Sequence, residues 1–179
     1  MKIIVEKITT VDDMREACCF TLNDQPERTT MTLEKIYQCL HSPARTQWFK
    51  VKMYGIPTSV SIHLARHNGG GTLHYVKTNR PDRGSVIKAD RDTPVNHMIW
   101  CNAEMLINIA HARMCYKSEA PTVKVMAAVA EATQQVDPDL FELLVPKCVY
   151  LQRCPELKSC GFFKEVSAGV EATKLDDEG

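Results

Sequence analysis

Hydrophobic periodicity divides the chain into short strands and amphipathic helices. Alternating apolar and polar residues are typical of a half-buried strand, and apolar residues three or four apart are typical of a helix on a core. The predicted elements are a strand over 1–9, helices over 10–22 and 30–40, a strand over 48–54, a helix or further strand over 59–67, a short strand over 72–77, a long helix over 93–116, a helix over 118–135 and a short helix from 137. This pattern predicts a helix-rich α+β domain with a small antiparallel sheet.

The helix over 93–116 is the strongest single prediction. Pro94 suits its first turn, and its apolar residues repeat at helical spacing as Ile99, Ala103, Leu106, Ala110 and Met114. Earlier in the chain, Gly55 and Pro57 predict the end of a strand, with Pro57 in the first turn of the next helix.

Polar residues form two stripes on that long helix. Asn102 and Arg113 are about three turns apart and are expected on one face. Asn108 belongs to a second stripe that also contains Glu104, His111 and Cys115. Two interpretations fit this pattern. One stripe could face solvent while the residues of the other are capped or paired within the fold, or the helix could lie inside an oligomer and line more than one ligand pocket.

Length and charge limit the class of protein. A chain of 179 residues with 44% hydrophobic content is expected to form one domain over 1–164, followed by a disordered polar tail over 165–179. The 22 basic residues balance the 22 acidic residues, so no overall field attracts nucleic acid or an acidic membrane. No secretory segment and no apolar run of about 20 residues is visible, which predicts a cytoplasmic protein.

Eight cysteines without an export signal are expected to be reduced. Five lie in helical patterns and are expected to act as small core residues. Cys148, Cys154 and Cys160 differ, because they are equally spaced near a proline and a glycine. They lack the C-x2-C spacing typical of zinc sites. Core packing or a surface position is therefore favoured over zinc, which would need an unidentified fourth ligand.

The stretch from Arg66 to Gly71 (RHNGGG) combines two side chains that can carry positive charge with a backbone open to unusual conformations. It predicts either an anion-binding nest or a plain turn. His63 and His67 are four residues apart and could chelate a metal on a helix, but no HExxH glutamate lies between them. Anion binding or internal hydrogen bonding is the preferred interpretation of these histidines.

Three ordered blocks of this chain resemble the flavin-dependent thymidylate synthase family. His41, followed by Ser42 and Pro43, lies 25 residues before Arg66, as the early histidine of the family typically lies before its signature arginine. The segment 56–67 leads into the Arg-His of the signature. The segment NAEMLINIAHARMCYKSEA is similar to the family pattern that begins NARELLHFLNLR.

The resemblance implies a homotetramer whose shared pockets hold FAD and dUMP. Methylenetetrahydrofolate would be the one-carbon donor, NADPH the reductant, and the thymidine nucleotide dTMP the default product. Positioning and electrostatics are the protein's expected contribution. The implied flavin-binding residues are His41, His67, Asn68, Asn102 and Asn108. The implied nucleotide-binding residues are His63, Arg66, Thr78, Arg80 and Arg113, of which Arg66 and Arg113 are the expected catalytic residues.

The chain departs from the family signature after His67. Asn68 stands where the family has an arginine, and a gapless alignment puts His74 at the position of an acidic residue. Thr78 and Arg80 match the later serine and arginine only with two extra residues. A pyrimidine nucleotide hydroxymethylase acting on dUMP or dCMP, a noncatalytic nucleotide-binding protein and a zinc-stabilised interaction module are therefore kept as alternatives. A phage or mobile-element origin would suit such divergence.

Overall fold

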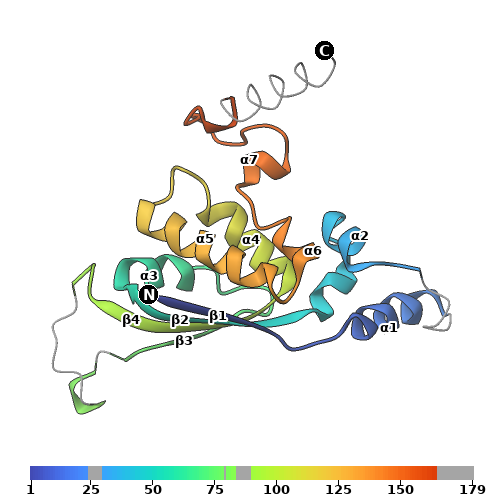
Figure 1. Cartoon of the computed structure of the whole chain (residues 1–179), viewed down its shortest axis with the longest axis horizontal. Coiled ribbons are helices and arrows are strands. Elements are labelled where there is room, and N and C mark those ends of the chain that lie inside the picture. The colour runs from blue at the N-terminus through green and yellow to red at the C-terminus, as the bar shows by residue number, and fades with distance from the viewer. Residues whose placement is uncertain (24–29, 79, 84–89, 165–179) are drawn as a thin grey trace.

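A four-stranded antiparallel sheet forms the base of the structure, a computed structural model that describes residues 1–23, 30–78, 80–83 and 90–164. Its strands, in spatial order, are β1 (Lys2–Lys7), β2 (Trp48–Pro57), β4 (Pro94–Asn102) and β3 (Leu73–Val76). Helices α3, α4, α5 and α6 lie over one face of this sheet, and α1 lies beyond its end (Figure 1). The α+β class predicted from the sequence is confirmed.

The helices follow the capping signals in the sequence. Thr10 caps α1, Thr32 caps α2 and Asp137 caps α6. The helical elements are α1 (Val11–Leu22), α2 (Leu33–Gln38), η2 (Ser42–Thr46), α3 (Thr58–Ala65), η3 (Pro81–Arg83), α4 (Ala103–Arg113), α5 (Ala120–Gln134), α6 (Pro138–Phe141) and α7 (Lys147–Tyr150).

The core lies between the sheet and helices α3, α4 and α5. Alternate residues of β2 and β4 face it, and Val51 and Ile99 are partners in register and are both buried. On the opposite face of the sheet the Lys50 ammonium lies 4.4 Å from the centre of the Trp100 ring. Burying a side chain such as Val51 or Ile99 contributes about 1.5–3 kcal/mol.

The predicted helix over 93–116 is wrong in its first half. Residues 94–102 form β4, and the helix begins only at Ala103, with Asn102 as its cap. Val95, His97, Ile99 and Cys101 are buried at every second position, as expected for a strand in a sheet. The backbone groups of this segment pair with β2 on one side and β3 on the other, which overrides the helical spacing of its apolar residues.

The predicted end of the second strand at residue 54 is also wrong. β2 continues to Pro57 across an irregularity between Met53 and Ile56, where Gly55 adopts a φ of 66°. A glycine absorbs this bulge because it tolerates positive φ. Pro57 caps α3 instead of lying in its first turn. The alternative of a strand over 59–67 is settled in favour of a helix.

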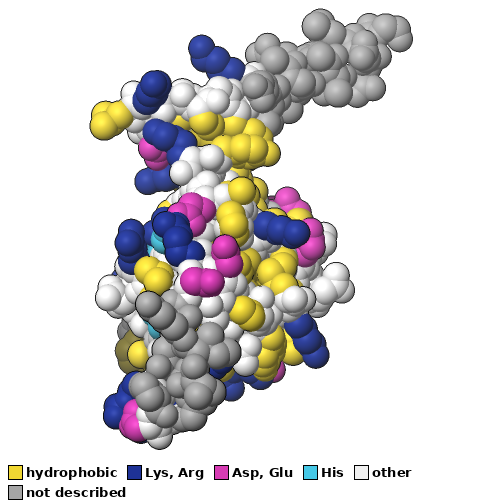
Figure 2. All heavy atoms as spheres, turned by 90° about the vertical axis from the view of Figure 1, so that its left-hand side faces the viewer, with side chains coloured by type: hydrophobic (Ala, Val, Ile, Leu, Met, Phe, Trp, Pro, Cys, Tyr) yellow, Lys and Arg dark blue, Asp and Glu magenta, His cyan; other side chains and the backbone are white. Residues whose placement is uncertain are grey.

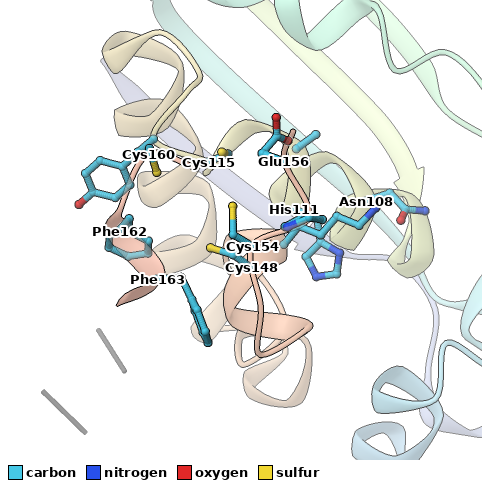
Figure 3. Close-up of a pocket in the computed structure, with 13 residues that line it drawn as sticks. Asn108, His111, Cys115, Cys148, Cys154, Glu156, Cys160, Phe162 and Phe163 are labelled. Carbon is cyan, nitrogen blue, oxygen red and sulfur yellow. The ribbon is translucent and has the colours of Figure 1, made fainter. Parts of the chain in front are cut away.

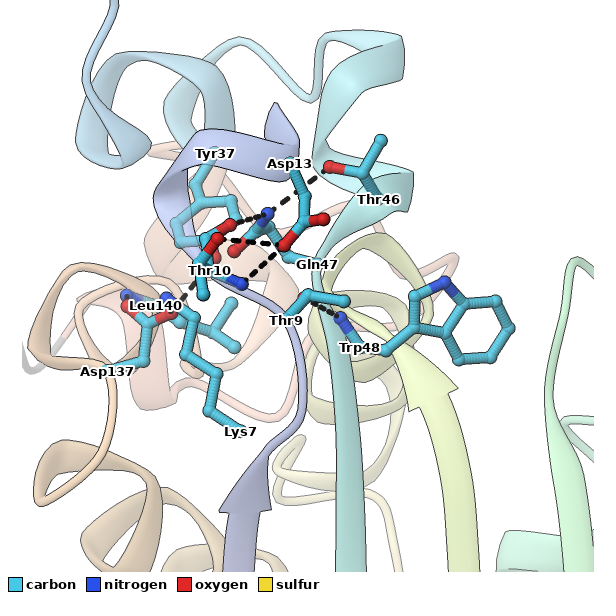
Figure 4. A network of polar contacts seen from close by, with 10 residues as sticks. All are labelled: Lys7, Thr9, Thr10, Asp13, Tyr37, Thr46, Gln47, Trp48, Asp137 and Leu140. Atoms are coloured by element: carbon cyan, nitrogen blue, oxygen red, sulfur yellow. Dashed lines mark hydrogen bonds and ion pairs between the residues drawn. The ribbon is translucent and has the colours of Figure 1, made fainter. Parts of the chain in front are cut away.

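A buried carboxylate fastens α6 to the start of the chain. Asp137 accepts hydrogen bonds from Lys7 at 2.7 Å, the Tyr37 hydroxyl at 2.9 Å and the Leu140 backbone at 3.1 Å (Figure 4). Nearby, the Gln47 side chain donates to the carbonyl of Thr10 at 2.9 Å. These contacts join β1, α2 and α6 and fix the end of the sheet from which η2 leads into β2.

The remaining predicted elements agree with the structure to within a few residues. The helix from Ala120 and the short strand over Leu73–Val76 are confirmed. The predicted polar tail over 165–179 and most of the loop NDQPERTT lie outside the described residues. Among the described helices, none has the length and apolar character needed to span a membrane.

Candidate functional site

The glycine loop that follows α3 lies along α4. At the start of α4, the Asn102 side chain donates to the carbonyl of Gly70 at 3.1 Å and accepts from the backbone of Met105 at 2.9 Å. A Cβ added to Gly71 would lie 3.2 Å from the Trp48 ring, and Gly70 and Gly71 both have positive φ. The glycines therefore allow a close approach that a larger residue would prevent.

At the other end of α4, Arg113 holds the histidine of the signature. Its Nε donates to Nε2 of His67 at 2.8 Å. A guanidinium has only donors, so His67 Nε2 carries no proton and the imidazole is neutral. Burial, the charge of Arg113 and the neighbouring His74 all lower the pKa of His67, in agreement with this geometry.

Arg66 directly precedes His67, so Arg66 and Arg113 both adjoin this histidine, one along the chain and one through a hydrogen bond. Burial lowers the pKa of Arg113, and the charge of Arg66 lowers it further. Within the described ranges, neither arginine makes an ion pair with a carboxylate. Both guanidinium groups therefore have donors left for an anionic ligand.

A cavity of about 390 Å³ is lined by Arg66, His63, Arg91 and Asp90 together with the first turn of α3. His63 Nδ1 lies 3.2 Å from the hydroxyl of Thr122, and its Nε2 lies 3.8 Å from a carboxylate oxygen of Glu119. The face where α3 and the start of α5 lie shows basic, acidic and histidine side chains next to one another (Figure 2). Arg91 pairs with Glu119, and the Asp90 carboxylate accepts from the hydroxyl of Thr93, so Arg66 is a cation of this cavity without an ion-pair partner among the described residues.

Several predicted site residues lie elsewhere in the monomer. His41 is exposed before η2, whereas Asn68 directly follows His67 on the loop but is exposed and makes no side-chain contact with another described residue that places it in the site. Arg80 forms an ion pair with Asp82 at 2.7 Å, and its backbone donates to the hydroxyl of Thr78. No contact found in the described part of the chain joins these residues to the Arg66 and Arg113 pair.

Asn108 lies on a different face of α4, as the second polar stripe predicts. It lines a cavity of about 290 Å³ beneath the segment 147–163, together with His111 and Cys115 (Figure 3). Cys148, Cys154 and Cys160 line the same cavity. Within the residues that the structure describes, no group of three or more His, Cys, Asp or Glu side chains is placed to hold a metal ion. The weak zinc candidates therefore have no structural support.

Sequence reasoning missed two polar residues beneath the loop. The Ser61 hydroxyl lies 2.9 Å from Nδ1 of His97, and Nε2 of His97 lies 3.0 Å from Nδ1 of His74. Burial and, second, His74 lower the pKa of His97 to about 4. The signal available in the sequence was the alternation of Val95, His97 and Ile99, which predicts a buried histidine once that segment is treated as a strand.

Comparison with known proteins gives matches in structure alone. No protein-family model and no curated protein matches the sequence. Two solved structures of the flavin-dependent thymidylate synthase of Helicobacter pylori, each with FAD and dUMP, match with TM-scores of 0.65 and 0.66 at 13% identity. They cover 81% of this chain, and this chain covers 99% and 100% of theirs.

A UMP/dUMP methylase from Streptomyces cacaoi, solved with 5-Br dUMP, matches with a TM-score of 0.59 at 12% identity. The match covers 79% of this chain and 94% of that enzyme. At these identities the likeness concerns the path of the backbone and leaves the reaction open. The chain has the fold of the flavin-dependent thymidylate synthases.

Proposed function

We propose that this chain is a flavin-dependent enzyme that transfers a one-carbon unit to a pyrimidine deoxynucleotide, by default converting dUMP to dTMP. The observation that carries the proposal is that Arg66 and Arg113 both adjoin His67, and that neither has an acidic partner among the described residues. Neutral His67 holds Arg113 in place. The solved structures with the same fold contain dUMP or a brominated dUMP, an anion of the kind that such a pair recognises.

Within this proposal the two arginines have different tasks. Arg66 lines the cavity beside α3 with His63 and is the better placed to take the nucleotide phosphate. Arg113 donates to His67 through Nε, which leaves the two terminal nitrogens of its planar fork for a carbonyl edge of the base. A cation beside that edge would stabilise negative charge developing on the pyrimidine ring.

The residues near the loop also suit an anionic flavin. The glycine backbone approaches α4 closely, and the neutral His67 retains an N–H at Nδ1. Asn102 uses its oxygen for the cap of α4 and one N–H for the loop, so it would orient the loop and have one further N–H for FAD. Bound reduced flavin would supply hydride chemistry. NADPH as reductant, methylenetetrahydrofolate as donor and a homotetramer with shared sites complete the proposal.

Flavin uptake and product analysis test this function directly. Purified protein is mixed with FAD and dUMP, and bound flavin is followed by its absorbance. Mass spectrometry of the nucleotide, after addition of methylenetetrahydrofolate and NADPH, distinguishes a methyl from a hydroxymethyl product. Arg66→Ala should abolish turnover, whereas Arg153→Ala, at an exposed position in the C-terminal segment, should not. Absence of flavin uptake by the wild-type chain would refute the proposal.

A second candidate is a protein of this fold that binds a nucleotide without turning it over. Asn68 favours it, because an uncharged amide replaces an arginine beside the proposed flavin site. Such a protein would bind dUMP in calorimetry and yield no product with folate and reductant. The same mass spectrometry assay therefore separates the two candidates.

A further inference from the structure

A chain of hydrogen bonds runs beneath the glycine loop from α3 to β3. It begins at the Ser61 hydroxyl, which lies 2.9 Å from Nδ1 of His97. It continues from Nε2 of His97 to Nδ1 of His74 over 3.0 Å. It ends where Nε2 of His74 lies 3.0 Å from the backbone carbonyl of His67.

Elementary chemistry sets the direction of every bond in this chain. A carbonyl oxygen only accepts, so His74 carries its proton on Nε2. In a neutral imidazole the other nitrogen accepts, so Nδ1 of His74 accepts a hydrogen bond from Nε2–H of His97. Nδ1 of His97 must then accept from the Ser61 hydroxyl. This arrangement has both histidines neutral. Because a serine hydroxyl can also accept, one added proton would reverse a bond and bury a charge, whereas two added protons would break the contact between the histidines.

His67 is thereby fixed at two atoms from two different elements. Its carbonyl accepts from His74 on β3, and its Nε2 accepts from Arg113 at the end of α4. Arg66 precedes it directly, and the glycine loop follows. The position of the proposed anion site therefore depends in part on His74, to which no ligand contact is assigned.

We propose that Ser61, His97 and His74 are positioning residues, which form a neutral, one-directional hydrogen-bond relay that holds His67 and the adjoining arginine pair in place. Protonating one relay histidine would place a charge at a buried position with no acidic partner among the described residues, and protonating both would set two N–H donors against each other between His97 and His74. This inference deepens the proposed function and rests on it for the identity of the ligand.

Among the described residues, no acidic side chain contacts the relay, so no negative charge there would stabilise a proton on it. Lys52, Tyr54, Tyr75 and Lys77 share the groove beside His97 on the outer side of β2 and β3, and Lys52 is already paired with Glu6. Helix α4 contributes the cation Arg113, which bonds to His67. Helix α3 contributes Ser61 and also carries His63, which contacts Thr122 and Glu119. In the described part of the chain, no carboxylate bonds to a member of the relay. Burial and the neighbouring His74 lower the pKa of His97 to about 4, in keeping with a neutral relay.

The relay is tested first without any ligand. Nitrogen-15 chemical shifts of the imidazoles should show that His74 and His97 are both neutral with the proton on Nε2 near neutral pH. Ser61→Ala should change the shift of His97 Nδ1 and speed amide exchange in the loop 67–71, whereas Ser159→Ala, at an exposed position, should do neither. A proton on Nδ1 of either histidine, or loop exchange unchanged in Ser61→Ala, would overturn the proposal.

A second variant separates positioning from general damage to the fold. In His97→Gln, the amide can donate to His74 and accept from Ser61 but cannot be protonated. It should retain the dUMP affinity of the wild type near neutral pH and lose less affinity on acidification, whereas His74→Leu should bind about tenfold more weakly. Equal dUMP binding by wild type and His74→Leu would overturn the relay as a positioning device. If the wild type binds no dUMP while the shifts and loop exchange behave as expected, the proposed function fails and the relay stands.

Discussion

The Nε of Arg113 donates to Nε2 of His67 across 2.8 Å and so joins the last residue of α4 to the loop after α3. This bond makes His67 an acceptor, fixes its neutral form and leaves the rest of the Arg113 fork for a ligand. The first prediction concerns that fork. In Arg113→Lys, a single ammonium cannot hold His67 and present a planar pair of donors together.

We expect this substitution to weaken dUMP binding about tenfold or more, with little change in thermal stability. Isothermal titration calorimetry gives the affinity. Arg153→Lys is the matched control at an exposed position. If Arg113→Lys binds as tightly as the wild type, the fork takes no part in recognition.

Three consecutive glycines offer an internal comparison. Gly71→Ala would place a methyl group 3.2 Å from Trp48 at a φ of 92°, and should destabilise the fold by about 1–2 kcal/mol. Gly69→Ala meets nothing within 4 Å and should change stability by less than about 0.5 kcal/mol. Urea unfolding of the two variants tests the difference. Equal stabilities would mean that the loop does not approach Trp48 closely.

Acid should destabilise the fold through His97. Burial first and His74 second lower its pKa from 6.5 to about 4 in the folded protein. Between pH 4 and pH 6.5 the unfolded chain therefore binds more protons than the folded protein. The stabilisation that depends on neutral His97 is complete above about pH 6.5 and is lost as the pH falls towards 4. Its size is on the order of 3 kcal/mol. His67 and His111, whose pKa values are also lowered, act in the same direction.

Urea unfolding at a series of pH values measures this loss. His97→Gln should flatten the profile, whereas His41→Gln, at an exposed histidine, should leave its slope unchanged. A free energy of unfolding that stays constant from pH 6.5 to pH 4 would contradict the assignment.

Asp137 should be a stability determinant far from the proposed site. Asp137→Ala leaves Lys7, the Tyr37 hydroxyl and the Leu140 backbone without their buried acceptor. We expect a loss of about 3–5 kcal/mol in the free energy of unfolding. Asp12→Ala removes only an exposed ion pair with Arg15 and should cost less than about 1 kcal/mol. Thermal unfolding of both variants gives the comparison, and similar melting temperatures would count against a structural role for Asp137.

Restoring the signature arginine should strengthen anion binding. Asn68 is exposed, so Asn68→Arg adds a cation next to the Arg66 and Arg113 region without displacing core atoms. FAD affinity should rise about three- to tenfold at low salt, and the gain should shrink as salt is added. Gln135→Arg, at an exposed position after α5, is the control for a general charge effect. An equal rise in FAD affinity in both variants would show that the effect comes from overall charge and not from a cation at position 68.

The sequence predicts most of the fold but hides the change from β4 to α4. Asn102 is both the last residue of the strand and the cap of the helix, so no loop separates the two elements. Ile99 and Ala103 are four residues apart and mimic a helical stripe across that boundary. Only pairing with β2 and β3, which is not local in sequence, decides the structure of this segment.

The sequence likewise predicts part of the candidate site, and contacts between distant segments decide the rest. The resemblance brings attention to Arg66, His67 and Arg113, and the structure places His67 against Arg113 and Arg66 near it. The relay through Ser61 and His97 could not be predicted, because it depends on the register that sets β3 beside β4. A lone serine on a helix and a lone histidine on a misassigned segment carry no pattern of their own.

The shortest strand of the sheet has a consequence for how the protein opens. β3 has four residues, lies at the edge and carries His74 as its link to His67. An edge strand of this length separates from its neighbour at a smaller free-energy cost than the central pair β2 and β4. Local unfolding of β3 would therefore disassemble the proposed site while the core stays intact. A ligand that binds only while β3 is paired with β4 should slow hydrogen exchange of the β3 amides. The exchange rate of these amides would therefore report whether the proposed site is occupied.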